Sequence, residues 1–140
     1  MKNVCITDDK KTVIFVSPVY PGKEHDKTIF LNEKMYKFLP DSPEKLFDSA
    51  FQGLEKDCPD MTKIIKPVKR KKGQLELNNR DKKRNKKISS KRVIIENAFS
   101  GVKRLKITWD IFRNIKYGFS YKIFLAACAI WNFHLSNSNV

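Results

Sequence analysis

The chain has 140 residues, enough for one domain with a hydrophobic core, and its formal net charge is +14. The N-terminus has no apolar run suited to a signal peptide, and the most apolar segment, residues 123–133, is too short to span a bilayer. The three cysteines lie far apart, without the spacing of a zinc site or a disulfide framework. These features exclude secreted and membrane-spanning classes, and they predict a cytoplasmic protein with reduced thiols.

The positive charge is concentrated between Lys66 and Arg92. This window holds thirteen basic and two acidic residues, so it carries +11 of the net charge. Such a run repels itself unless it meets a polyanion, and nucleic acid is the commonest one. A solvated basic loop is the alternative that charge alone leaves open. A membrane surface fits less well, because the run has no interleaved apolar face.

The first elements predicted are a β-hairpin and a helix. Residues 4–7 and 12–17 are β-rich runs around a polar tetrapeptide, so Asp8 and Asp9 fall at the tip, where turn chemistry explains them better than a metal site. Residues 26–39 have apolar side chains at helical spacing, with Asp26 as the expected N-cap. The adjacent His25 is expected to have a capping or packing role.

Asp48 follows a very short apolar run, residues 45–47, that reads as a buried strand. Ligands gather at strand ends in open α/β sheets, which favours a functional carboxylate there. The alternative is an aspartate that caps the following turn, and the two readings are evenly balanced. Residues 63–68 predict a further short strand, and residues 69–88 an exposed basic loop.

Residues 89–105 predict a helix that carries one acid, Glu96, among basic residues, with Ser89 or Ser90 as its N-cap. Its apolar face consists of Ile94, Ile95, Ala98, Phe99, Val102 and Leu105. Glu96 lies opposite this face, near Arg92. One interpretation is a solvated Glu96 side chain that forms an ion pair with Arg92, and such a pair stabilises the helix by about 0.3–0.5 kcal/mol. The other is a carboxylate that faces a metal and a phosphate. This helix alone favours the first reading.

The C-terminal part predicts a turn with a short helix or coil over residues 107–115 and a long helix over residues 120–134 that closes the core. Trp109 and Phe112 could stack on bases, although a core position explains both more simply. Residues 136–140 are expected to be a frayed tail.

Three segments resemble one family in type and order. They are PGKEHDK at residues 21–27, FDSAFQGL at residues 47–54 and RVIIENAF at residues 92–99. Shorter blocks follow at residues 102–104, 112–114 and 131–133. Together they resemble the DDE-type transposases of bacterial insertion sequences and their Harbinger-like relatives, over residues 4–133.

This resemblance implies an α/β, ribonuclease-H-like fold with a mixed sheet of five strands flanked by helices. In that family two Asp and one Glu hold two divalent cations, Mg²⁺ or Mn²⁺, for in-line attack on a DNA phosphodiester. By position, Asp48 matches the second Asp and Glu96 the Glu, both as catalytic metal ligands. The expected DNA contacts are Lys69, Arg70, Lys71, Lys72, Lys82, Lys83, Arg84, Lys86, Lys87, Lys91, Arg92, Lys103 and Arg104.

The first Asp of the family pattern, usually in a "D-G-T"-like phrase, has no counterpart in this sequence. Asp8 and Asp9 cannot replace it, because they occupy the hairpin tip. We therefore expect residues 1–135 to be the C-terminal part of a catalytic domain that lacks its first, central strand. Unpaired sheet edges predict marginal stability and no useful nuclease activity alone.

The sequence leaves three hypotheses. The first is a fragment of a transposase of the kind that cleaves DNA and transfers strands, located with DNA in the nucleoid. It is either a truncated remnant or one half of a split enzyme that an upstream half would complete, and its oligomeric state is open. The second is a non-catalytic basic protein that binds nucleic acid. The third is a decayed mobile element without a function.

Overall fold

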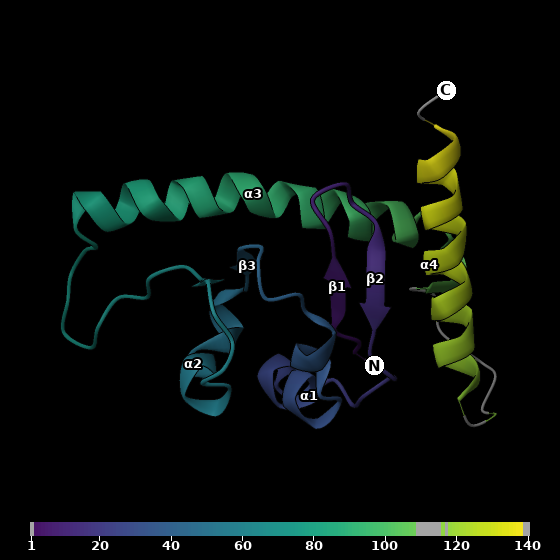
Figure 1. The fold of residues 1–140 in the computed structure, drawn as a ribbon, viewed down its shortest axis with the longest axis horizontal. Coiled ribbons are helices and arrows are strands. Elements are labelled where there is room, and N and C mark those ends of the chain that lie inside the picture. The colour runs from purple at the N-terminus through teal and green to yellow at the C-terminus, as the bar shows by residue number, and fades with distance from the viewer. Residues whose placement is uncertain (1, 109–115, 117, 139–140) are drawn as a thin grey trace. The chain divides into compact units, whose positions relative to one another are not determined.

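The computed structural model describes residues 2–108, 116 and 118–138. It is mixed α/β, which confirms the predicted class (Figure 1). Its α-helices, β-strands and 3-10 helices (η), in chain order, are β1 (Cys5–Thr7), β2 (Val13–Val16), α1 (Asp26–Asn32), η1 (Met35–Phe38), β3 (Lys45–Leu46), η2 (Ser49–Phe51), α2 (Leu54–Asp57), β4 (Ile64–Ile65), α3 (Asn79–Lys103), η3 (Lys106–Thr108) and α4 (Phe119–Asn137). The chain divides into two compact units, Met1–Glu24 with Val93–Val140, and His25–Arg92.

The first unit contains the predicted hairpin. β1 and β2 pair antiparallel, with Cys5 opposite Val16 and an irregularity after Ile6. At the tip, Asp8 Oδ1 accepts hydrogen bonds from the backbone N–H groups of Lys10, at 2.9 Å, and Thr12, at 2.7 Å. The hairpin and the turn role of Asp8 are therefore confirmed.

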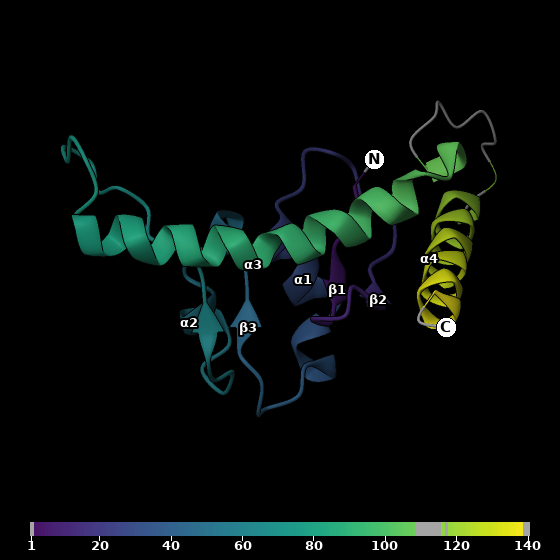
Figure 2. The ribbon, with the colours of Figure 1, turned by 90° about the horizontal axis from the view of Figure 1, so that it is seen from above.

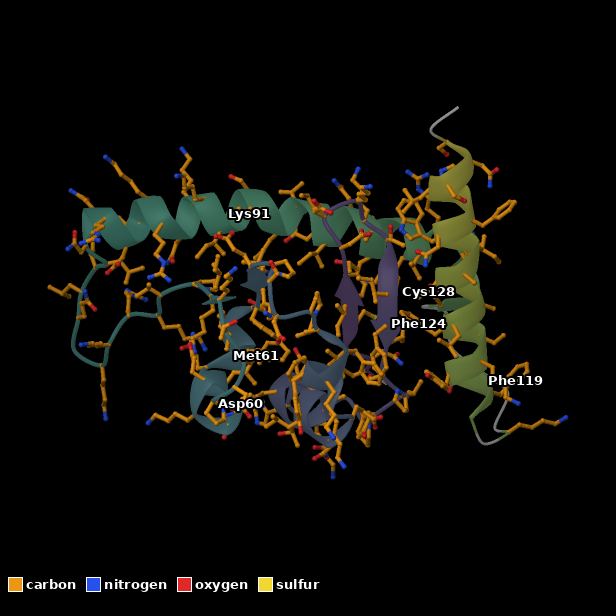
Figure 3. The ribbon with its side chains drawn as sticks, in the orientation of Figure 1. Asp60, Met61, Lys91, Phe119, Phe124 and Cys128 are labelled. Atoms are coloured by element: carbon orange, nitrogen blue, oxygen red, sulfur yellow. The ribbon has the colours of Figure 1, made fainter. Side chains whose placement is uncertain are left out.

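The core of the first unit lies between β2, the end of α3 and α4. Its fully buried members are Val16, Val102, Ala127 and Cys128. Figure 3 shows Cys128 and Phe124 on the side of α4 that faces β2, and both pack in this core. Ala98 and Val102 of the predicted apolar face of α3 are about 1% exposed, which confirms the direction of that face.

Two neighbouring side chains of α4 attach it to the hairpin. The Asn132 side chain accepts a hydrogen bond from Val13 N at 2.9 Å and donates one to Val13 O at 2.8 Å, while Trp131 Nε1 donates to Lys11 O at 3.0 Å. On α3, Gly101 lies against the indole of Trp131, where an added Cβ would be 2.2–2.4 Å from three ring carbons. The predicted helix at residues 120–134 is confirmed. It continues to Asn137, so the start of the predicted frayed tail is helical instead.

In the second unit, α1 begins one residue earlier than the predicted N-cap implies. His25 is the N-cap and Asp26 the first helical residue, so the prediction of Asp26 as the N-cap was wrong, and His25 makes no side-chain capping bond. The helix also ends early, because Lys34 adopts a left-handed conformation with φ of 51° before the separate turn η1 begins.

The core of the second unit is aromatic. The ring of Phe30 meets Phe47 at 5.4 Å and Phe51 at 5.7 Å between centroids, both edge-on. In the same unit β3 and β4 pair parallel, with Lys45 opposite Ile64. Both predicted short strands are therefore present, and Asp48 comes two residues after β3 ends.

The largest correction concerns α3, which begins at Asn79 and is drawn as one continuous helix in two views (Figures 1 and 2). Residues 79–88 are helical and not part of the predicted basic loop. Neither Ser89 nor Ser90 is the N-cap as predicted, because both lie inside the helix, and Ser90 Oγ donates to Lys86 O. The start is instead held by Asn78, whose Oδ1 accepts from Arg80 N at 3.0 Å. Lysine and arginine are good helix formers, so the charge did not prevent a helix.

Trp109 and Phe112, predicted either to stack on bases or to lie in the core, are outside the residues that the structure describes. None of the helices within the described ranges is both long and apolar enough to cross a membrane.

Candidate functional site: two carboxylates and a basic helix

The backbone after β3 places the Asp48 carboxylate at the surface. Asp48 is extended, with φ of −75° and ψ of 167°, and it is the N-cap of η2. Its Oδ1 accepts a hydrogen bond from the Ser49 N–H. Its Oδ2 has no protein partner among the residues that are described, and the side chain is 47% exposed. Asp48 thus caps the turn and still presents one free carboxylate oxygen.

Arg92, from α3, forms an ion pair with this carboxylate. Its Nη1 lies 3.3 Å from Asp48 Oδ1, and its side chain is 38% exposed. Three further contacts dock this part of α3 within the second unit. Ile88 is buried, the Asn85 amide bonds both backbone groups of Val68, and Lys91 Nζ donates to Glu44 Oε2 at 2.8 Å. The hydrogen bond from Lys91 lowers the pKa of Glu44 below its usual value.

Glu96 is exposed on α3, which agrees with its predicted place opposite the apolar face. It follows Arg92 by four residues, so the two lie on the same side of the helix. Glu96 belongs to the first unit, whereas Asp48 and Arg92 belong to the second.

The structure separates the basic residues into two groups that the sequence treated as one. Some are held by carboxylates, namely Lys82 by Glu76, Lys91 by Glu44 and Arg92 by Asp48. Arg70 donates instead to the carbonyl of Leu75 at 3.0 Å. The cations in the described chain for which the structure gives no carboxylate partner include Lys69, Lys71, Lys72, Lys83, Arg84, Lys86 and Lys87.

Four exposed cations share one face of α3: Arg80, Lys83, Arg84 and Lys87. Their spacing of three, four and seven residues aligns them over about 10 Å of helix. Arg80 was not predicted as a site residue. An N-cap at Asn78 starts the helix at residue 79, and this start places Arg80 on the same face as the other three cations.

Lys103 and Arg104 are exposed at the end of α3, in the first unit. The structure therefore does not gather all thirteen predicted DNA contacts on one element.

Neither the carboxylates nor the thiols form a metal cluster by themselves. Within the described ranges, no three His, Cys, Asp or Glu side chains are grouped to hold a metal ion. The three cysteines are free. Burial raises the pKa of Cys5 to about 12, with a smaller contribution from Cys128, and burial raises that of Cys128 to about 11. Both thiols are therefore protonated at neutral pH and are poor metal ligands.

Comparison with known families gives a match that spans most of the chain. Residues 1–132 match the family described as DDE superfamily endonuclease. Searches of curated proteins and of solved structures each found no match. The family match agrees with the resemblance carried by the segments at residues 21–27, 47–54 and 92–99. The chain therefore belongs to the DDE superfamily endonucleases.

Proposed function

We propose that this chain is a transposase-like DNA endonuclease domain of the insertion-sequence type, with Asp48 and Glu96 as ligands of a divalent cation. Membership of the DDE endonuclease family supports a DNA substrate. The observation that carries the proposal is the position of Asp48, two residues after the strand β3 that pairs parallel with β4, and with one carboxylate oxygen open. A ribonuclease-H-like sheet, which combines parallel and antiparallel strands, is part of the same proposal.

The donor chemistry suits Mg²⁺ or Mn²⁺, because both prefer carboxylate oxygens to nitrogen and sulfur ligands. When bound, such a cation would stabilise charge on the phosphate and activate the attacking oxygen. Asp48 and Glu96 are two donors, where the family resemblance implies three. We therefore propose that the chain alone cleaves DNA poorly, and that a third carboxylate would have to come from elsewhere, for example from another part of the same transposase.

The basic face of α3 would hold the DNA. Arg80, Lys83, Arg84 and Lys87 are exposed along one side of the helix, a pattern that suits successive phosphates. Contacts of this kind position a duplex without reading its sequence, and they make affinity fall steeply with salt.

Titration of the full chain with Mn²⁺, followed by calorimetry, tests the metal proposal. Asp48→Asn and Glu96→Gln should each weaken Mn²⁺ binding at least tenfold. Asp60→Asn is the matched control, because it removes an exposed carboxylate from the second unit without touching the candidate ligands. Equal Mn²⁺ affinity in Asp48→Asn and the unmodified chain would refute the proposed site.

The second candidate function is a non-catalytic protein that binds nucleic acid. It is favoured by the double engagement of Asp48 Oδ1, which the Ser49 N–H and Arg92 already occupy. In that case DNA affinity would be the same with and without Mn²⁺, both in the unmodified chain and in Asp48→Asn.

A further inference from the structure

We infer that Arg92 is a positioning residue that couples phosphate binding to cation binding at Asp48. The inference rests on the proposed role of Asp48 as a metal ligand. In this arrangement the Arg92 guanidinium opposes a divalent cation at Asp48 until a phosphate engages it.

The geometry at Asp48 places two kinds of cation in competition. Arg92 Nη1 is 3.3 Å from Oδ1, and Oδ2 of the same carboxylate has no partner in the described part of the chain. A divalent cation on Oδ2 would therefore be a close neighbour of the guanidinium charge. The guanidinium and the divalent cation would repel each other at this short distance, and both would compete for the negative charge of the Asp48 carboxylate.

A phosphate offers Arg92 a better partner than Asp48 does. The guanidinium presents a planar fork of donors that matches two phosphate oxygens at once, whereas its contact with Asp48 is made through Nη1 at 3.3 Å. The exposed cations one to three turns earlier on α3 would raise the local concentration of a polyanion. Binding of a phosphate at Arg92 would neutralise or withdraw its charge and so raise the cation affinity of Asp48. By linkage, a bound cation would raise phosphate affinity by the same factor.

The fold allows Arg92 to be altered without losing the site. Asp48 Oδ1 keeps its hydrogen bond from the Ser49 N–H, so the carboxylate retains its orientation. The helix keeps its buried Ile88, the Asn85 amide bonds to Val68 and the Lys91–Glu44 pair. Arg92→Gln should therefore fold like the unmodified chain.

The test is Mn²⁺ titration of the full chain with and without a short DNA duplex, after subtraction of a duplex-only titration. Without DNA, Arg92→Gln should raise Mn²⁺ affinity about two- to fivefold, the range expected from loss of an exposed ion pair. DNA should raise Mn²⁺ affinity in the unmodified chain, and this increase should be lost in Arg92→Gln.

Lys27→Gln is the control, since it removes one positive charge from the same unit at a lysine that is paired with Asp57 and not with Asp48. It should change Mn²⁺ affinity less than Arg92→Gln and keep the effect of DNA. Equal effects of the two variants, or an unchanged DNA effect in Arg92→Gln, would overturn the inference while the metal site stands. Mn²⁺ binding that survives Asp48→Asn would instead overturn the proposed function on which it rests.

Discussion

Gly101 provides a sharp test of how α3 and α4 pack in the first unit. Alanine has a higher helix propensity than glycine, so on propensity alone Gly101→Ala would stabilise the chain by about 1 kcal/mol. However, the new Cβ would be 2.2–2.4 Å from three ring carbons of Trp131, whereas carbon atoms pack at about 3.5–4.0 Å. Either the helices separate by more than an ångström, or the indole moves.

Either response is costly. Overpacking of this kind costs about 1–3 kcal/mol. Movement of the indole would also weaken its hydrogen bond to Lys11 O, worth about 1 kcal/mol. After the propensity gain is subtracted, Gly101→Ala should lower the free energy of unfolding by about 1–3 kcal/mol.

The assay is urea unfolding followed by far-ultraviolet circular dichroism. Ser100→Ala is the control, because Ser100 is exposed on the same turn of helix and reports propensity alone. In a Trp131→Leu background, Gly101→Ala should become neutral or stabilising. A stabilised Gly101→Ala single variant would refute the close approach of α3 and α4 at this position.

Three further predictions follow from described contacts. Asn132→Ala should lower the free energy of unfolding by about 1–3 kcal/mol in the same assay, because a backbone N–H and a carbonyl lose their partner. Lys83→Gln should reduce the slope of log DNA affinity against log salt concentration, measured by fluorescence anisotropy, by about 0.9. Lys82→Gln should reduce this slope less, because its charge is already paired with Glu76. Equal reductions would contradict the division of the cations into those with and those without a carboxylate partner. The pKa values of Cys5 and Cys128 are raised from 9.0 to about 12 and about 11, so their contribution to stability is present below pH 9 and is lost as pH rises through the folded values. Unfolding free energy should therefore decline above about pH 9 in urea titrations, and a decline that is unchanged when both are replaced by alanine would contradict this.

Local patterns in the sequence were enough to predict several elements. The hairpin follows from two β-rich runs, and the turn role of Asp8 from its place between them. The position of Asp48 after a strand follows from a short apolar run that ends there. Each of these features depends on residues that are close in sequence, so one short stretch of the chain contains all the information needed to predict it.

The remaining features depend on distant residues or on competing signals. The Asp48–Arg92 pair joins residues 44 positions apart, and no local pattern indicates it. The helix α3 starts ten residues before its predicted start, because the lysine and arginine side chains of residues 79–88 favour a helix despite their charge and the Asn78 amide caps it. At Asp26 and His25 the two candidate caps are adjacent, and one residue of uncertainty is typical of helix ends.

The attachment of Asn132 to Val13 has a consequence for how the hairpin meets other chains. An exposed strand edge is a template for pairing with a further strand, and it favours aggregation. At Val13 the N–H and the carbonyl are both taken by one side-chain amide, so no incoming backbone can use them without displacing α4. The helix thereby protects that edge of the hairpin, and strand addition at this residue would require α4 to detach.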